Sequence, residues 1–172
     1  MPRREAKFSV NARPEELWKF LRDFRSLCTC IPGVERIAVL DDRNAELTVK
    51  EKLGVVPLIV DLKASIDSEE PPRRLHATAR AEHLTMTIEV ALQKTASGTE
   101  LTSVFDVKGE GQLKSIVDRL FERKATERTA QFAECLGKRF GAASPAKAPE
   151  PARGGWLGRL LAWLRRRLSS SS

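Results

Sequence analysis

Alternation of apolar and polar residues with a period of two runs through residues 34–108 and constrains the fold more than any other feature of the chain. In the stretch Val56–Ile66, every even-numbered position is apolar and the odd positions after residue 60 are polar. Similar alternation occurs in three further segments, which are residues 75–81, 86–93 and 101–107. Strands with one apolar and one polar face are typical of an antiparallel sheet that covers a core on one side. We therefore expect a meander of about six antiparallel strands.

The residues after this region have the 3.6-residue period of a helix. Apolar side chains from Leu113 to Phe140 form one stripe, which predicts a helix of about 25 to 28 residues. Before the meander, residues 6–12 read as a short strand, and a helix is expected from Pro14 to about Asp23. A second, shorter helical piece then leads to a turn at Pro32-Gly33. A single long helix can bury its stripe only against a curved sheet, so the predicted fold class is α+β.

The net charge of +7 is concentrated at the C-terminus. Residues 141–172 hold six basic residues against Glu150, whereas residues 1–140 hold 24 basic and 22 acidic residues. The high pI of 9.7 therefore gives no argument for nucleic-acid binding by the body of the chain. No apolar stretch approaches the roughly 20 residues of a spanning helix, and the N-terminus lacks the apolar core of a signal peptide.

The three cysteines give no pattern of metal or disulfide chemistry. Cys28 and Cys30 form a C-x-C pair without a second pair, whereas zinc sites need four ligands. Cys135 lies far along the chain, on the apolar stripe of the long helix. We interpret all three as small buried hydrophobic side chains of a reduced, cytoplasmic protein.

Catalytic motifs are missing from the sequence. His76 falls on the polar face of its strand, and His83 either faces inward as a polar contact for a ligand or marks the strand end. The acidic cluster of Asp67, Glu69 and Glu70 precedes two prolines and reads as a solvated turn. Nucleophile elbows, phosphate loops and zinc-protease motifs are lacking, so we predict a binding protein rather than an enzyme, with no metal-bound or covalent cofactor.

The order of strand, two helices, six strands and long helix resembles the START-related, polyketide-cyclase-like superfamily, which has a helix-grip fold. More narrowly, residues 5–140 resemble the CoxG family of carbon monoxide dehydrogenase. The residues that carry this resemblance include Phe8-Ser9-Val10, Pro14 to Trp18, Leu21-Arg22-Asp23, Cys30 to Glu35, Leu53-Gly54, Glu70 to Arg74, Gly98 to Leu101 and Gln131-Phe132. The resemblance implies a hydrophobic cavity, an accessory role beside a molybdenum hydroxylase at the membrane, and an isoprenoid quinone or other lipid as the ligand.

Small inward-facing residues favour a cavity between the sheet and the long helix. Ala77, Ala79 and Ala81 occupy three consecutive inward positions. The chain departs from the resemblance around positions 80 to 86, where family members often have glycine-rich strands and this chain has Ala79, Ala81 and Met86, and this departure bears on the size of the cavity. The alternative is that Met86 and Phe105 fill this space and leave an ordinary core. The complete set of candidate wall residues is Leu58, Val60, Leu62, Ala77, Ala79, Ala81, Met86, Ile88, Val90, Phe105, Val117, Leu120 and Phe121.

The C-terminal tail predicts a membrane contact. Residues 141–155 are rich in proline and alanine and read as a tether, residues 156–168 as a basic amphipathic helix, and residues 169–172 as a disordered serine tail. A short helix with tryptophan and leucine on one face and arginine on the other lies in a bilayer interface. Its candidate membrane-binding residues are Trp156, Leu157, Arg159, Leu160, Leu161, Trp163, Leu164, Arg165, Arg166, Arg167 and Leu168. Docking of this helix in a protein groove is the alternative, and RNA binding ranks lower.

Together these features predict a START-like ligand-binding domain in residues 1–140, tethered to the inner leaflet of the cytoplasmic membrane. The expected function is carriage of a quinone-like lipophilic molecule for a partner redox enzyme. Two alternatives stay open at this point: a recruitment adaptor with no ligand, and a cyclase or hydratase, which would need an ionisable pair in the cavity.

Overall fold

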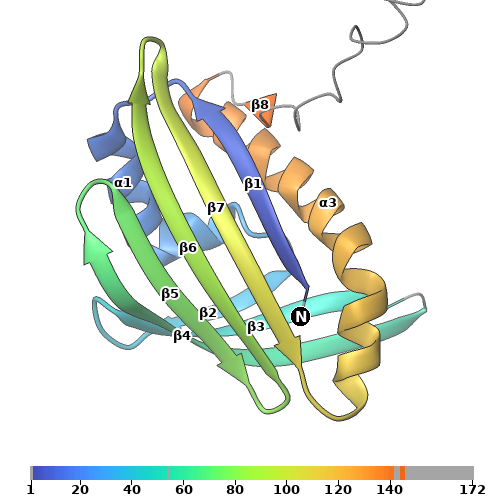
Figure 1. Cartoon of the computed structure of the whole chain (residues 1–172). Helices are drawn as coiled ribbons and strands as arrows, with labels where there is room; N and C mark the ends of the chain where they lie inside the picture. Colours follow the sequence, from blue (N-terminus) through green and yellow to red (C-terminus); the bar gives the residue numbers. More distant parts are fainter. Residues whose placement is uncertain (1, 54, 142–143, 146–172) are drawn as a thin grey trace, which may run out of the picture.

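The computed structural model describes residues 2–53, 55–141 and 144–145, and its elements follow the predicted order (Figure 1). A first strand and two short helices precede the meander, and one long helix follows it. The bounds are β1 Arg3–Val10, α1 Pro14–Arg22, α2 Phe24–Thr29, β2 Val34–Val39, β3 Asn44–Leu53, β4 Val56–Glu70, β5 Arg74–Ala81, β6 Leu84–Thr95, β7 Gly98–Gly109, α3 Gln112–Phe140 and β8 Ser144–Pro145.

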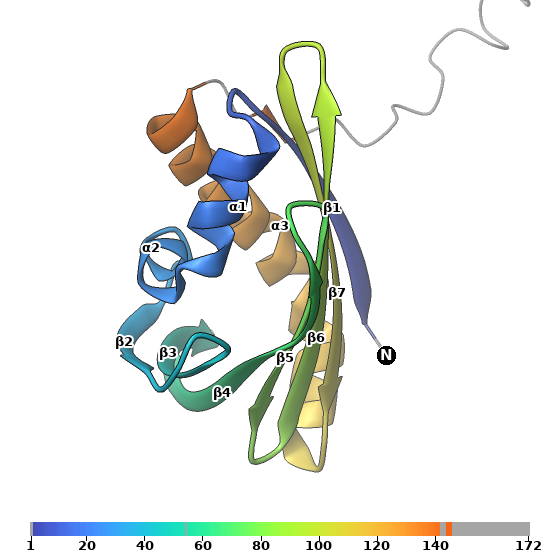
Figure 2. The same ribbon diagram turned by 90° about the vertical axis from the view of Figure 1, so that its left-hand side faces the viewer.

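All neighbouring strands of the sheet pair antiparallel, in the order β2-β3-β4-β5-β6-β7-β1-β8. Seen from the side, β2, β3 and β4 bend toward the helices, so that the sheet curves around them (Figure 2). The meander of six strands, β2 to β7, and the long C-terminal helix confirm the predicted α+β helix-grip architecture. Helix α3 has 29 residues, slightly more than the periodicity predicted.

The packed core lies where α1 and the C-terminal half of α3 meet the sheet. Phe8, Leu17, Leu101 and Leu136 are almost completely buried there. The ring of Phe8 stands edge-on to Phe132 of α3, with 5.5 Å between centroids. Such contacts between β1, β7, α1 and α3 hold the helices on the concave face of the sheet.

The break between α1 and α2 has a local cause. The carboxylate of Asp23 accepts hydrogen bonds from the backbone amides of Arg25 and Ser26, and so caps the start of α2. The Ser26 hydroxyl also donates to Asp23 over 2.7 Å, and these bonds lower the pKa of Asp23. This capped restart separates α1 from α2, and the sequence predicted both of these short helices.

Two described residues of the predicted tether belong to the sheet. Ser144 and Pro145 pair with Ser9 and Phe8 as the short edge strand β8. Proline is tolerated at such an edge because its missing amide is not needed there. The remainder of the predicted tether, the membrane-binding helix of residues 156–168 and the serine tail lie outside the described residues.

Candidate functional site

The ten strand residues of the predicted cavity wall lie on one face of the sheet. The register places Ala79 between Ala64 of β4 and Met86 of β6, and it places Ile88 opposite both Ala77 and Phe105. Side chains of directly paired residues point to the same face of an antiparallel sheet. The alternation in the sequence therefore predicted this grouping correctly for four strands, β4 to β7.

Burial along this face is uneven. Near α1, Ile66, Leu75, Leu92 and Leu101 are buried. Toward the other end of the strands, the wall residues keep accessible surface, as do those on the N-terminal half of α3. Of the thirteen predicted wall residues, Leu62 and Ala79 are buried and the other eleven are only partly buried. The wall residues on this part of the sheet and on the first half of α3 therefore keep part of their apolar surface accessible.

Ion pairs from opposite sides of the sheet hold α3 beside this uncovered surface. On β3, Glu51 lies 3.0 Å from Lys124 and forms hydrogen bonds with the guanidinium of Arg128. On β1, Arg4 pairs with Glu122 at 3.1 Å. Because β1 and β3 lie on opposite sides of the meander, α3 is fixed to both of them.

Electrostatics make Glu51 a structural anion. Burial by itself would raise the pKa of Glu51, but the hydrogen bonds from Arg128 and Lys124 outweigh it, and the pKa is lowered. The hydrogen bond to Glu51 in turn raises the pKa of Lys124. A carboxylate held ionised between two cations is poorly suited to donate a proton, so this cluster does not resemble a general acid.

These pairs were missed in the sequence, although a signal for them exists. Glu51 continues the inward parity of Ala45, Leu47 and Val49, and its neighbour across the hairpin is Leu58. A charged residue in an apolar register needs a partner when it is buried. The same reasoning applies to Arg4, which precedes the inward residues of β1.

The Pro32-Gly33 turn brings β3 into position. Gly33 has a φ of +88°, and a Cβ there would lie only 2.6 Å from the carbonyl oxygen of Lys50. The Gly33 carbonyl also accepts a hydrogen bond from the Lys50 amide, at 2.7 Å. The turn therefore packs against β3 directly before Glu51, and its glycine is required by this close approach.

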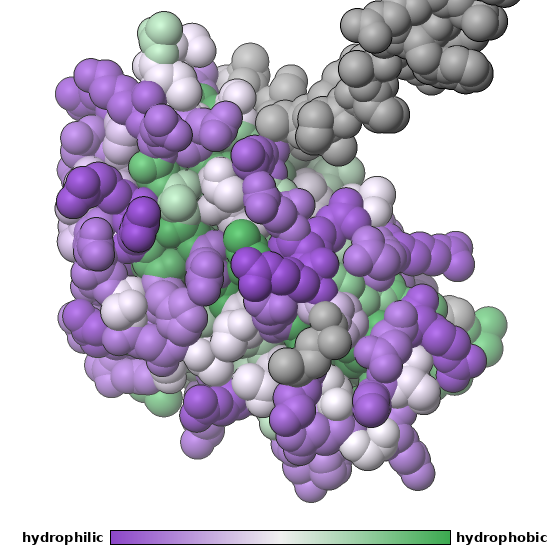
Figure 3. Space-filling model, in the orientation of Figure 1, coloured by the Kyte–Doolittle hydropathy of each residue, from purple (hydrophilic) through white to green (hydrophobic). Residues whose placement is uncertain are grey.

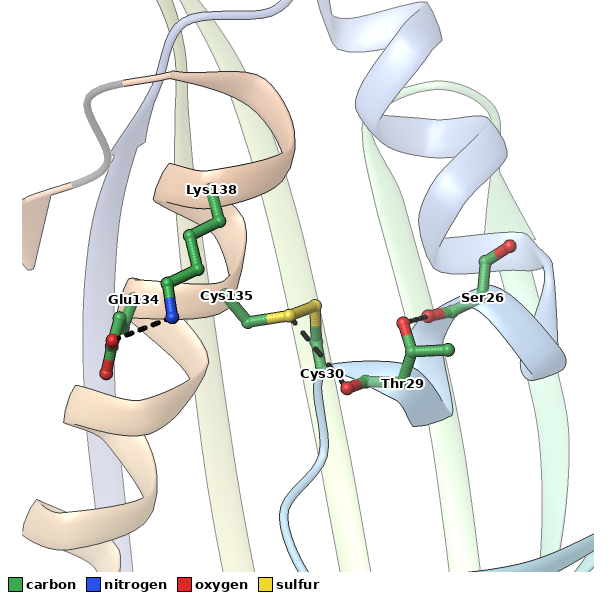
Figure 4. The surroundings of a disulfide bond; sticks show 6 residues. All are labelled: Ser26, Thr29, Cys30, Glu134, Cys135 and Lys138. Carbon is green, nitrogen blue, oxygen red and sulfur yellow. Dashed lines mark hydrogen bonds and ion pairs between the residues drawn. A yellow bond between two sulfur atoms is a disulfide. The ribbon is translucent and has the colours of Figure 1, made fainter.

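Two cysteines are joined, which corrects the interpretation of all three as reduced small hydrophobic residues. Cys30, at the end of α2, forms a disulfide with Cys135 of α3 (Figure 4). Their Cα atoms lie 5.4 Å apart although 105 positions separate them in the sequence, and no local pattern reports such a distance. Cys28 stays a buried free thiol, and burial raises its pKa to about 11.

The remaining polar candidates lie away from the concave face. His76 is half-exposed and contacts Asp67 at 3.2 Å, and the Thr78 hydroxyl donates to that same carboxylate at 2.6 Å. His83 follows the end of β5 and is exposed, as the strand-end interpretation predicted. No group of three or more metal-ligating side chains occurs among the described residues.

The prediction of a solvated acidic turn is wrong. Asp67, Glu69 and Glu70 all lie in β4, which continues through Glu70 before the chain turns. Glu69 is mostly buried and pairs with Arg22 of α1 at 2.6 Å and with Arg43 at 3.3 Å. A register shift between Ile66 and Ser68 changes which face each residue occupies, and this irregularity hid the inward position of Glu69.

A surface hollow of about 520 Å³ lies at the turn between β7 and α3. It shares no residue with the predicted wall. Its lining residues are Pro2, Val107, Lys108, Gly109, Glu110, Gly111, Lys114 and Asp118. None of the described helices is both long and apolar enough to span a bilayer.

Comparison with known proteins identifies the family. The profile of the carbon monoxide dehydrogenase protein CoxG matches residues 6–141. The chain belongs to the CoxG family of carbon monoxide dehydrogenase. This family match covers the helix-grip domain from within β1 to the end of α3, including the Cys30–Gly33 segment and the candidate wall. A search of curated proteins found no match.

Solved structures share the fold of this CoxG family member at low sequence identity. A conserved protein from Geobacillus kaustophilus superposes with a TM-score of 0.67 and 17% identity, covering 80% of this chain and 94% of that one. A START superfamily protein from Mycobacterium smegmatis superposes with a TM-score of 0.63 and 13% identity, covering 80% of this chain and 97% of that one. A protein from Chromobacterium violaceum superposes with a TM-score of 0.62 and 15% identity, covering 83% of this chain and 99% of that one. These likenesses establish the START-like fold.

Proposed function

We propose that this protein binds a lipophilic molecule of the isoprenoid-quinone class between its concave sheet and α3. The observation that carries the proposal is that apolar residues of both elements are only partly buried, such as Met86 and Ile88 on the strands and Val117 and Phe121 on α3. An apolar wall with few polar groups suits a lipophilic ligand. Membership of the CoxG family supports an accessory role beside a molybdenum hydroxylase of the carbon monoxide dehydrogenase type.

The proposed setting is the cytoplasmic face of the membrane, where the protein is peripheral. The basic, tryptophan-containing segment 156–168 supports this placement from sequence alone. In this arrangement the domain collects or delivers its ligand at the bilayer and meets its enzyme partner there.

A catalytic role has less support than binding. The predicted wall contains no ionisable side chain, whereas a cyclase or hydratase needs a proton donor and acceptor at its substrate. The charged groups beside the wall are held in ion pairs, Glu51 with Lys124 and Arg128, and Arg4 with Glu122. We therefore propose a carrier and not an enzyme.

Blocking the wall with a larger side chain tests the proposal. Ala81→Phe adds a ring on the concave face at a partly exposed position, and Ala91→Phe adds the same ring on the opposite, outer face as a control. We expect decyl-ubiquinone, measured by native mass spectrometry and by quenching of intrinsic fluorescence, to bind the wild type and Ala91→Phe. Ala81→Phe should lose most of this binding and keep its melting temperature within a few degrees.

Two results would count against the carrier. Equal binding by Ala81→Phe and wild type would show that the ligand does not occupy this face. If neither decyl-ubiquinone nor any extracted lipid binds the wild type, the adaptor without a ligand becomes the better explanation.

A further inference from the structure

Two hairpins of the sheet expose large aliphatic side chains. At the end of the β3–β4 hairpin, Val55 is 98% exposed, Val56 59% and Ile59 60%. At the β2–β3 hairpin, Val39 is 37% exposed and Leu40 59%. Clustered aliphatic groups on a surface mark a contact site more often than isolated ones do.

The β3–β4 hairpin extends past the long helix. Glu51 binds Lys124 and Arg128, so β3 crosses α3 at that point, and the residues beyond Glu51 lie farther out. Figure 1 shows the end of this hairpin projecting on the far side of α3. Figure 3 shows hydrophobic colour at the same end of the molecule, beside hydrophilic side chains.

Charge distinguishes the two hairpins. In the β3–β4 pair, Lys50 lies opposite Ile59 and Lys52 lies opposite Pro57, and residues 52–60 contain no acid. Lys52 therefore places a cation beside the apolar end, and Lys50, farther back, lies 3.7 Å from Glu35. In the β2–β3 turn, Leu40 is followed directly by two acids, Asp41 and Asp42. Backbone and side-chain hydrogen bonds from Arg43 and Asn44 lower the pKa of Asp41 and keep it ionised.

We infer that the end of the β3–β4 hairpin inserts into the interfacial layer of an anionic bilayer. Val55 and Val56 enter the apolar boundary first, and Ile59 follows at its edge. The long stems of Lys50 and Lys52 let their ammonium groups extend back to the phosphates. A protein partner fits less well. Protein interfaces favour aromatic residues, methionine and arginine and are depleted in lysine, and this hairpin end has lysine with branched aliphatic residues.

This contact would connect the bilayer with the candidate wall. Val56, Leu58, Val60 and Leu62 alternate along one face of β4, from the hairpin end to the predicted wall. Six residues of strand span about 20 Å. A lipophilic molecule leaving the bilayer at the hairpin thus has an apolar surface to follow. This inference deepens the proposed function and rests on it for the ligand, but the membrane contact itself is tested separately.

A label on the hairpin reports its depth directly. Cys28 is buried, and Cys30 is joined to Cys135, so a cysteine introduced at the surface is the accessible thiol of the full chain. Val55→Cys and, as the matched control, Leu40→Cys are each labelled with a polarity-sensitive fluorophore. They are then mixed with vesicles of equal parts phosphatidylglycerol and phosphatidylcholine, with and without lipids that carry a nitroxide quencher.

We expect quenching at position 55 and none at position 40. As a second measurement, the pair Val55→Ser and Val56→Ser should weaken sedimentation of the full chain with the same vesicles by about tenfold or more. The matched pair Val39→Ser and Leu40→Ser should leave sedimentation unchanged, and melting temperatures confirm that both double variants fold.

Each other outcome overturns the inference in a distinguishable way. If the chain sediments with vesicles and neither position is quenched, the tail is the anchor and the hairpin plays no part. If both positions are quenched equally, insertion is not specific to the β3–β4 hairpin. If the chain does not sediment at all, both this inference and the proposed membrane association fail.

Discussion

Removal of the disulfide between Cys30 and Cys135 should destabilise the fold more than any single surface change. The bond joins residues 105 positions apart, so it restricts a large loop of the unfolded chain. The chain-entropy model gives about 4.7 kcal/mol for a loop of this size, and loss of native disulfides typically costs about 2–5 kcal/mol. Cys135→Ala should therefore lower the free energy of unfolding by about 2–5 kcal/mol.

The assay compares urea unfolding, followed by far-ultraviolet circular dichroism, with and without dithiothreitol. Wild type should lose stability when reduced, and Cys135→Ala should be insensitive to the reductant. Cys28→Ala is the matched control, because Cys28 is a free thiol and its removal leaves the disulfide intact. That variant should keep the full difference between the oxidised and reduced states.

Thiol titration in denaturant tests whether the disulfide between Cys30 and Cys135 is present. Oxidised wild type should show one free thiol, that of Cys28. Equal stability of the oxidised and reduced protein, with the bond verified by this titration, would refute the entropic argument. Three free thiols after exposure to air would refute the pairing itself.

Two further predictions concern Glu51 and the tail. The folded chain lowers the pKa of Glu51, so its ionised form contributes stability above the ordinary pKa of 4.5, and this contribution is lost as the pH falls. The difference in unfolding free energy between wild type and Glu51→Gln should thus be constant near neutrality and shrink below about pH 4.5. A difference that stays constant down to pH 3 would contradict this prediction. Deleting residues 153–172 should strongly reduce sedimentation with anionic vesicles at an unchanged melting temperature, and undiminished sedimentation would remove the tail as anchor. A salt series separates the electrostatic and the apolar contributions of the tail to vesicle binding. Glutamine in place of Arg159, Arg165, Arg166 and Arg167 should flatten the salt dependence of binding. Alanine in place of Trp156 and Trp163 should weaken binding at every salt concentration.

The sequence predicted the fold and the composition of the inner face well because both depend on local periodicity. Alternation along β4 to β7 states which residues share a face, and the register of the sheet agrees with it. The register shift between Ile66 and Ser68 shows the limit of this reasoning. One irregular residue reverses the parity, so Glu69 turned inward where a solvated turn was expected.

The contacts that fix the helices could not be predicted in the same way. The pairs Cys30–Cys135, Arg22–Glu69 and Glu51–Arg128 each join residues from separate elements, and their partners are set by the curvature of the sheet. From a single sequence, a charged residue at a position that alternation assigns to the apolar face can be recognised, and its burial there requires a partner of opposite charge. It does not contain the identity of that partner.

The placement of these contacts is compatible with the proposed ligand site. The disulfide and the Arg22–Glu69 pair lie with the buried core near α1 and the C-terminal half of α3. The pairs of Glu51 and Arg4 instead hold the middle of α3 to β3 and β1, at the two sides of the meander. Apolar residues between these two pairs can therefore stay partly uncovered while the fold is fixed elsewhere. A cavity for a lipophilic ligand requires this separation, because a core that packed along its whole length would leave no room for a guest.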